Sequence, residues 1–246
     1  MHTGPHPNPL PAVPGEGTKI AIVTGAGRGI GRATAIELSQ RGYVVVLVAR
    51  TESQLDETAL LCPGETVVLP TDVRDAAAVA SNVSRVIHRF GRVDALVNNA
   101  GLAPLGPFLE TVDQYNDVLA TNLGAAVRFT QAVWPTMLRQ KAGVVVNLSS
   151  YAARDPFPGF SLYAAAKAAV NGFTTALAKE AEPAGIRVHA VAPAGVETEM
   201  LRKIAAEDVV PPESTLTPQA VAKVIAGCVT GDLAATSGET VYLHKS

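Results

Sequence analysis

Tyr163 and Lys167 stand four residues apart in a helix-like run of small residues, Tyr-Ala-Ala-Ala-Lys-Ala-Ala. On a helix this spacing places both side chains on one face. An ammonium group beside a phenol stabilises the phenolate, so we expect Lys167 to lower the pKa of Tyr163 from about 10. Such a phenol can exchange a proton with an alcohol or a carbonyl. A Tyr and a Lys at this spacing are common and usually inert, so the pair needs support from elsewhere in the chain.

A glycine-rich segment near the N-terminus suits a different task, the binding of a phosphate group. Its sequence is Thr24-Gly25-Ala26-Gly27-Arg28-Gly29-Ile30-Gly31, and it lies between an apolar run and a helix-like segment. A tight turn from a strand into a helix presents backbone N–H groups to an anion such as a pyrophosphate. A simple turn without a ligand is the alternative, because a glycine pattern by itself is a weak indicator.

The elements that would position these residues alternate regularly from Thr18 onward. Runs of β-branched and apolar residues predict strands at 19–23, 44–48, 66–69, 95–98, 144–148, 187–191 and 240–243. Segments of helical period lie near 29–41, 52–61, 75–90, 112–139, 161–182 and 217–228. Unbroken apolar runs are typical of strands buried on both faces, and the alternation favours right-handed βαβ units. We therefore predict an α/β fold: a single doubly wound Rossmann domain, with a seven-stranded, mainly parallel sheet flanked by helices on both faces.

Three motifs in this order and spacing resemble those of the short-chain dehydrogenase/reductase (SDR) family. They are the segment 24–31, with the spacing T-G-x-x-x-G-x-G, then Asn98-Asn99-Ala100-Gly101, and Tyr163-x-x-x-Lys167. The resemblance extends from about residue 18 to about residue 243. The length is similar to that of 3-oxoacyl carrier-protein reductases, although many unrelated reductases share it. The resemblance implies an oxidoreductase that transfers a hydride between NADP(H) and a carbonyl or alcohol substrate.

The resemblance also implies a catalytic set. Tyr163 would act as the general acid/base, Lys167 would hold the nicotinamide ribose and tune Tyr163, and Ser150 would orient the substrate oxygen. Asn122, in the long predicted helix, would kink that helix and hold a water molecule that connects Lys167 to solvent. For Asn122 a side-chain contact with the backbone is the alternative, and for Ser150 the alternative is a turn hydroxyl. We assign Ser149 a structural role.

The end of the second predicted strand, Ala49-Arg50-Thr51, bears on which nicotinamide cofactor is bound. An enzyme that prefers NAD places a carboxylate here to accept a hydrogen bond from the ribose 2′-OH. Ala49 offers none, whereas the guanidinium groups of Arg50 and Arg28 suit a dianionic 2′-phosphate, and Thr51 adds a hydroxyl. The pattern therefore predicts NADP(H), with Arg50 as a solvated surface residue as the alternative.

The resemblance implies further cofactor contacts after the later strands. Asp72 would bind the adenine amino group and the backbone amide of Val73 would meet the adenine ring; a helix N-cap ahead of residue 75 is the alternative for Asp72. Contacts with the rest of the cofactor would come from Asn99, Ala100 and Gly101 after the fourth strand, and from Pro193, Val196 and Thr198 after the sixth.

Two positions depart from the family pattern. Ala194 stands where glycine is usual, so we expect Gly195 to supply the flexibility of this turn. His189 stands where Asn is commoner. Because it lies inside a predicted strand, we interpret it as a packed structural histidine rather than a general base.

Two segments are predicted to form the substrate pocket. Residues 199–216 would be a short mobile lid, with the apolar residues Met200, Leu201, Ile204, Val209 and Val210. Residues 151–160 would face it, with Tyr151, Phe157 and Phe160 near the reacting carbonyl. These side chains favour an apolar or mixed carbonyl or alcohol substrate.

Composition excludes several classes of protein. The formal net charge is −2 with no basic block, which argues against a nucleic-acid partner. The apolar runs are far shorter than the ~20 residues of a membrane span. Cys62 and Cys228 form no metal motif, and the absence of a secretory signal predicts a cytoplasmic protein. Residues 1–17 are rich in Pro and Gly and predict a disordered tail, or a misassigned start, ahead of a domain at 18–246.

The assembly and the rival functions complete the expectations. The helices at 112–139 and 161–182 carry apolar residues over much of their surfaces, so we predict a homodimer or homotetramer, unless these residues merely cover the sheet. A non-catalytic NADP(H) sensor is one rival, disfavoured because it would need no proton donor. An NAD-linked alcohol dehydrogenase is disfavoured by Ala49 and Arg50. An epimerase or dehydratase on the same fold usually has a larger C-terminal substrate region.

Overall fold

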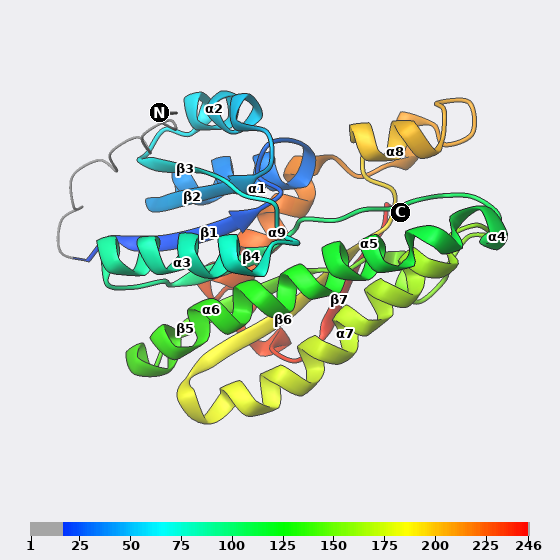
Figure 1. Ribbon diagram of the computed structural model, residues 1–246. Coiled ribbons are helices and arrows are strands. Elements are labelled where there is room, and N and C mark those ends of the chain that lie inside the picture. The colour runs from blue at the N-terminus through cyan, green and yellow to red at the C-terminus, as the bar shows by residue number, and fades with distance from the viewer. Residues whose placement is uncertain (1–16, 246) are drawn as a thin grey trace, which may run out of the picture.

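A computed structural model describes residues 17–245, so the tail predicted at 1–17 lies, except for Gly17, outside the described residues. Within them, seven strands form one parallel sheet in the order β3-β2-β1-β4-β5-β6-β7 (Figure 1). The strands are β1 (Lys19–Thr24), β2 (Tyr43–Ala49), β3 (Thr66–Pro70), β4 (Ala95–Asn98), β5 (Gly143–Leu148), β6 (Ile186–Pro193) and β7 (Thr240–Leu243). The predicted fold class is confirmed, and every predicted strand overlaps an observed one with ends shifted by no more than two residues.

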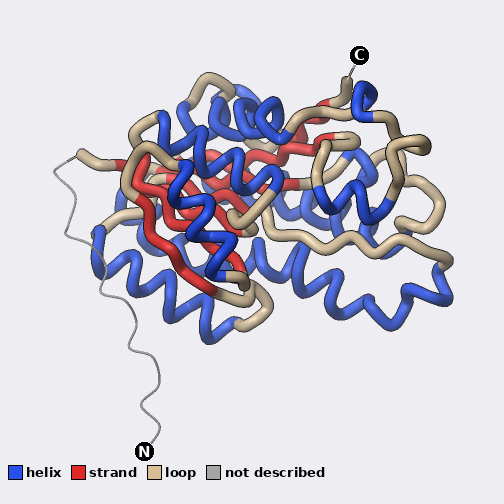
Figure 2. Tube along the Cα trace, turned by 90° about the horizontal axis from the view of Figure 1, so that it is seen from above, coloured by secondary structure: helices blue, strands red, loops and turns tan. Residues whose placement is uncertain are grey.

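The main helices pack on both faces of this sheet (Figure 2). They are α1 (Gly29–Gln40), α2 (Glu52–Leu61), α3 (Ala76–Phe90), α6 (Ala125–Gln140), α7 (Ser161–Ala181) and α9 (Pro218–Thr230). Side chains of α3, α6 and α7 pack in one core, and those of α1, α2 and α9 pack in another. Successive residues of β1 divide between these cores, Ile20 and Ile22 in the first and Ala21 and Val23 in the second, because strand side chains alternate in direction.

The single helix predicted at 112–139 is wrong in detail. The chain forms short helical pieces, α4 (Phe108–Thr111), a 3₁₀ turn (Val112–Gln114) and α5 (Tyr115–Leu119), followed by a π-helical turn (Ala120–Gly124) that leads into α6. A π turn leaves backbone carbonyls without their usual partners. Arg128 Nη1 donates to the Ala120 carbonyl at 3.2 Å, and this contact satisfies one of those groups.

The strand order locates the site. The chain moves outward from β1 through β2 to β3, then crosses back to β4 on the other side of β1. In open α/β sheets, ligands bind outside the carboxyl ends of the strands at such a reversal. Residues 25–31 follow β1 and residues 99–101 follow β4, so both predicted motifs lie beside this crevice.

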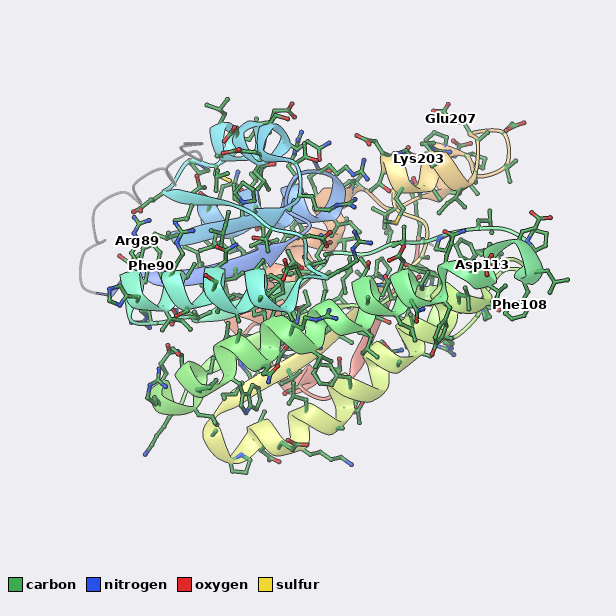
Figure 3. The ribbon with its side chains drawn as sticks, viewed as in Figure 1. Arg89, Phe90, Phe108, Asp113, Lys203 and Glu207 are labelled. Carbon is green, nitrogen blue, oxygen red and sulfur yellow. The ribbon has the colours of Figure 1, made fainter. Side chains whose placement is uncertain are left out.

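The segment predicted as a lid contains helix α8 (Glu199–Ile204) and a 3₁₀ turn (Pro212–Ser214). Lys203 and Glu207 project from its outer side (Figure 3). Arg202 forms an ion pair with Glu197, and its Nη1 donates to the Val210 carbonyl at 2.8 Å, so internal contacts hold the segment together. Whether it moves stays a prediction.

Within residues 17–245, no helix combines the length and apolar character that crossing a membrane requires. No group of acidic, His or Cys side chains in that part of the chain is arranged to hold a metal ion.

Candidate active site

A cleft of about 990 Å³ runs along the carboxyl edge of the sheet, from the glycine loop to Tyr163. Most of the predicted site residues lie on its wall, although they come from seven separate stretches of chain. Three predicted residues do not reach the wall: Thr24, Gly31 and Asn122 are placed behind it. These three support the cleft from within the protein.

Thr24 and Asn99 join the glycine loop to the end of β4. The Thr24 hydroxyl accepts the backbone N–H groups of Asn99 at 2.9 Å and Ala100 at 3.0 Å. In return, the Asn99 amide donates to the carbonyl oxygens of Thr24 at 2.8 Å and Gly25 at 3.2 Å. These bonds satisfy buried backbone groups at the crevice and fix the position of the loop.

Gly31 shows why the loop needs glycine where α1 packs against it. A Cβ atom at Gly31 would lie 2.1 Å from the Gly25 carbonyl oxygen. Gly25 itself has φ +67°, a conformation that side chains disfavour. The turn is therefore as tight as the phosphate-binding interpretation requires.

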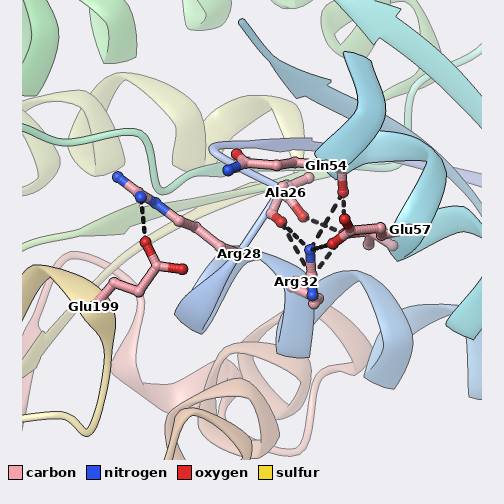
Figure 4. A network of polar contacts seen from close by, with 8 residues as sticks. Ala26, Arg28, Arg32, Gln54, Glu57 and Glu199 are labelled. Atoms are coloured by element: carbon pink, nitrogen blue, oxygen red, sulfur yellow. Dashed lines mark hydrogen bonds and ion pairs between the residues drawn. The ribbon is translucent and has the colours of Figure 1, made fainter. Parts of the chain in front are cut away.

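A polar network that the sequence interpretation missed holds the other side of this loop (Figure 4). Arg32 donates from Nε to the Gly27 carbonyl at 3.0 Å and pairs with Glu57 at 2.8 Å. The hydroxyl of Thr58 donates to the Ala26 carbonyl at 3.0 Å. The carbonyl groups of the loop that face away from the cleft need hydrogen-bond donors. A basic residue at the start of the following helix, here Arg32, is the sequence feature that could have indicated such a donor.

The end of β2 lies at the adenosine end of the cleft. Ala49, Arg50 and Thr51 all line it, and Arg50 is exposed. Arg28 also lines the cleft, but its guanidinium is paired with Glu199 of α8, with Nη1 and Oε2 2.5 Å apart. The two predicted phosphate ligands are thus near the expected place, and one of them has an acidic partner that the sequence did not indicate.

Asp72 lies on the cleft wall and is clamped by Arg74, a residue that the sequence interpretation did not select. Arg74 pairs with Asp72 at 2.8 Å and with Asp117 of α5 at 2.9 Å. The hydrogen bond from Arg74 is the main cause that lowers the pKa of Asp72 to about 2. The alternative role of Asp72 as the N-cap of α3 is wrong, because Asp75 caps that helix through Oδ1.

Ser150, Tyr163 and Lys167 meet at the opposite end of the cleft. Ser150 stands two residues after the end of β5, and its side chain is a cause that lowers the pKa of Tyr163. Its Oγ also accepts the Ala152 N–H at 3.2 Å, so the turn-hydroxyl role holds as well. Ser149 is buried and donates to the Lys167 carbonyl at 3.2 Å, which agrees with its assigned structural role.

Lys167 is buried beneath Tyr163. Its Nζ donates to the Leu148 carbonyl at 2.6 Å and lies 5.7 Å from the centre of the Tyr163 ring. Burial disfavours the charged ammonium and lowers the pKa of Lys167 to about 8.

The expected lowering of the Tyr163 pKa is wrong for the protein alone. Burial of the phenol raises its pKa, and the hydrogen bond with Ser150 opposes this shift only in part. Desolvation outweighs the hydrogen bond, while the Lys167 ammonium donates to a backbone carbonyl. Tyr163 is therefore a protonated phenol at neutral pH, which is the form that donates a proton.

Asn122 sits in the π-helical turn and binds the loop after β4. Its amide nitrogen donates to the Leu102 carbonyl at 2.8 Å and the Val118 carbonyl at 2.9 Å, and its oxygen accepts the Leu102 N–H at 3.3 Å. The contact with backbone, the alternative considered for Asn122, is present. A Cβ atom on Gly101 would lie 3.7 Å from Lys167 Nζ, so this loop passes directly beside the lysine.

The loop after β6 brings Pro193, Val196 and Thr198 to the cleft. Thr198 Oγ1 accepts the Leu201 N–H at 3.3 Å and so caps α8. Gly195 is not among the residues with positive φ, so the backbone conformation of this turn does not itself require glycine, and the expected flexibility stays a prediction. The Leu216 N–H donates to its carbonyl at 2.8 Å, and this bridge holds the turn in an ordinary conformation.

His189 lies in β6, fully buried and away from the cleft wall. Its Nδ1 is 3.0 Å from the Thr236 hydroxyl. Burial is the largest cause that lowers its pKa to about 4, followed by the charge of Arg187. It is a packed structural histidine, as the sequence indicated.

The substrate end of the cleft is apolar on both sides. All of the side chains expected from 151–160 and 199–216 line it, together with Leu102 and Leu105, which the sequence interpretation missed. Phe157 is 73% exposed and Leu105 43% exposed, so the mouth of the cleft presents apolar surface to solvent.

A parallel sheet with a glycine loop after β1 and a Ser–Tyr–Lys group at its carboxyl edge defines a Rossmann-type oxidoreductase. The family model described as short chain dehydrogenase matches residues 19–209, and the chain belongs to this family.

Individual relatives agree with this assignment. The chain is 34% identical to the 3-oxoacyl-acyl-carrier-protein reductase FabG of Escherichia coli (strain K12), over 92% of this chain and 96% of the relative. It is 42% identical to the short-chain reductase protein NovJ of Streptomyces niveus, over 76% of this chain and 72% of the relative. Among solved structures, levodione reductase matches with a TM-score of 0.86 and 28% identity, over 92% of this chain and 96% of that chain.

Proposed function

We propose that this oxidoreductase transfers a hydride between NADP(H) and a carbonyl or alcohol substrate, with Tyr163 as the general acid/base. The observation that carries the proposal is the convergence of Ser150, Tyr163 and Lys167 in the same cleft as the glycine loop. Proton donor and phosphate-binding loop occupy the two ends of one cavity, as hydride transfer to a carbonyl requires.

The residues at the loop fit a dinucleotide. The N-terminal turn of α1 has no acidic residue, and its N-cap residue, Arg28, makes no side-chain cap. The backbone N–H groups of this turn are therefore available to a pyrophosphate. Ala49 places no carboxylate at the end of β2, and Arg50 is exposed on the cleft. These features support NADP(H) over NAD(H).

The chemistry divides between the cofactor and the chain. Bound NADPH would supply the hydride to the carbonyl carbon. Tyr163 donates its phenolic proton to the carbonyl oxygen, and Ser150 donates a hydrogen bond to the same oxygen. Lys167 stabilises the phenolate that remains. The raised pKa of Tyr163 keeps the phenol protonated at neutral pH, as proton donation to a carbonyl requires.

The substrate proposal rests on the apolar walls and on the relatives. Leu102, Leu105, Phe157, Met200 and Val209 all line this cleft. A neutral carbonyl on an apolar chain or ring fits this surface better than a small charged acid. Because relatives are named as 3-oxoacyl reductases, a 3-oxoacyl thioester is the first substrate to test.

The experiment is a calorimetric titration with NADPH and with NADH, followed by NADPH oxidation with a 3-oxoacyl thioester and a panel of neutral ketones. Tyr163→Phe should lose turnover by about a thousandfold or more while NADPH affinity is kept, since proton transfer contributes roughly 10²–10⁴-fold. Tyr115→Phe is the matched control, because Tyr115 is 50% exposed and not on the cleft wall. Full activity in Tyr163→Phe would refute the mechanism.

The same measurements separate the rivals. Tight NADPH binding without turnover of any carbonyl would favour a sensor. Tighter binding of NADH, with oxidation of alcohols, would favour an NAD-linked dehydrogenase.

We also propose that the protein forms a homodimer or homotetramer through the helices of the predicted interface. Apolar side chains are exposed within the helical region predicted at 112–139, including Leu138 at 43% and Val127 at 40%, and Phe108, at 54%, lies just before it. Figure 3 shows Phe108 at the end of the molecule where α4 lies. Size-exclusion chromatography with light scattering measures the mass of the assembly. A monomer at micromolar concentration would contradict the proposed homodimer or homotetramer.

A further inference from the structure

The guanidinium of Arg28, one of the two predicted ligands of a 2′-phosphate, already pairs with a carboxylate of α8. It extends away from Gln54 and Arg32 toward Glu199, as Figure 4 shows. Its Nη1 lies 2.5 Å from Glu199 Oε2, and the two side chains are 45% and 62% exposed. The pair joins the glycine loop to α8 across 171 residues of sequence.

Contacts around the start of α8 fix the position of Glu199. It is the first residue of α8, and the preceding Thr198 caps that helix. Thr198 also packs on the loop, because a Cβ atom on Gly29 would lie 3.2 Å from its methyl group. The start of α8 therefore rests on the glycine loop and holds the carboxylate beside the Arg28 guanidinium.

Arg28 is thus shared between two possible anions, of which the protein supplies one. On the basis of the proposed NADP(H) function, we propose that Glu199 is a specificity-determining residue that competes with the cofactor 2′-phosphate for Arg28. NADPH must draw Arg28 away from Glu199, whereas NADH, which has no such phosphate, leaves the ion pair in place. Glu199 therefore weakens the preference for NADPH that Arg28 and Arg50 create.

The charges support competition rather than assistance. A phosphate dianion offers more charge and more acceptor oxygens to a guanidinium than one carboxylate does. A carboxylate that remains close to a bound phosphate repels it. Because the Arg28–Glu199 ion pair is exposed, breaking it costs little free energy. This small cost sets the size of the change in NADPH affinity that is expected when Glu199 is removed.

The test compares Glu199→Gln with the unchanged protein in calorimetric titrations with NADPH and NADH at low ionic strength. The Kd for NADPH should fall about two- to fivefold and that for NADH should stay the same, the range expected for an exposed ion pair. Glu213→Gln is the matched control: it removes one negative charge from the same segment, and Glu213 is exposed and not on the cleft wall.

A double-mutant cycle with Arg28→Gln and Glu199→Gln isolates the role of Arg28. In the Arg28→Gln background, the added Glu199→Gln change should improve NADPH binding much less, since no shared guanidinium remains and only direct repulsion is relieved. Persistence of the full effect there would overturn the proposal, because Glu199 would then act by simple repulsion. Weaker NADPH binding in Glu199→Gln would also overturn it and would make Glu199 a support for Arg28.

The ratio of the Kd values for NADPH and NADH distinguishes a failure of this inference from a failure of the proposed function. An unchanged Kd ratio in Glu199→Gln, in a protein that prefers NADPH, would remove the role of Glu199 alone. A protein that prefers NADH, but shifts toward NADPH in Glu199→Gln, would contradict the proposed cofactor and support the competition.

Discussion

Acidification should destabilise this protein through His189, which is fully buried in β6. Its Nδ1 contacts Thr236, and its Nε2 is buried without a hydrogen-bond partner. A proton added to the ring would leave a buried positive charge near Arg187. The folded protein therefore keeps the neutral form to about pH 4, the value to which the pKa is lowered.

The magnitude follows from linkage between protonation and folding. The unfolded chain binds a proton at His189 as the pH falls below about 6.5, while the folded state does not until about pH 4. Stability from this group is complete above the unfolded pKa and is lost as the pH falls toward the folded one. With these two values, the loss between pH 7.5 and pH 5 is about 2 kcal/mol.

The assay is equilibrium urea unfolding at pH 7.5 and pH 5, followed by the fluorescence of Trp134, which packs against the core. His189→Asn is the comparison, since an amide can still contact Thr236 but does not titrate. The variant has a smaller side chain and is less stable at both pH values, yet its free energy of unfolding should fall by about 2 kcal/mol less than that of the unchanged protein. Equal losses in the two proteins would refute this account of His189.

Three further outcomes are expected. Arg50→Ala should weaken NADPH binding about ten- to hundredfold and NADH binding little, because a charged hydrogen bond to phosphate is lost; equal losses in titration would contradict the cofactor assignment. In pH profiles of kcat/KM, activity should fall as the pH rises through about 8, where Lys167 loses its proton, and Lys167→Arg should lack this limb; an identical limb in that variant would exclude Lys167 as its source. Gly31→Ala should weaken NADPH binding at least tenfold, since the new Cβ would lie 2.1 Å from the Gly25 oxygen, whereas Gly172→Ala, which meets nothing within 4 Å, should bind normally; normal titration of Gly31→Ala would show that the loop can adjust.

Much of the fold was predictable because its signals are local. Apolar runs of strand length and helical periods alternate along the chain, and each run becomes a strand of the parallel sheet. The four-residue spacing of Tyr163 and Lys167 places both on one face of α7, and both reach the cleft. The resemblance implied a kink at Asn122, but the π-helical form of the turn at Ala120–Gly124 was not predictable from local signals, because Asn122 bonds to a loop that follows another strand.

The sequence by itself determined the class of fold, the order of its elements and the residue types at the carboxyl edge, because these follow from periodicity and short spacing. Only the tertiary structure decided how the charges pair and which way the pKa values move. Arg28 meets Glu199, and Arg74 clamps Asp72 while Asp75 caps α3, because separate segments come together there. The pKa of Tyr163 rises because burial outweighs its neighbours, and burial is a property of the packed chain alone.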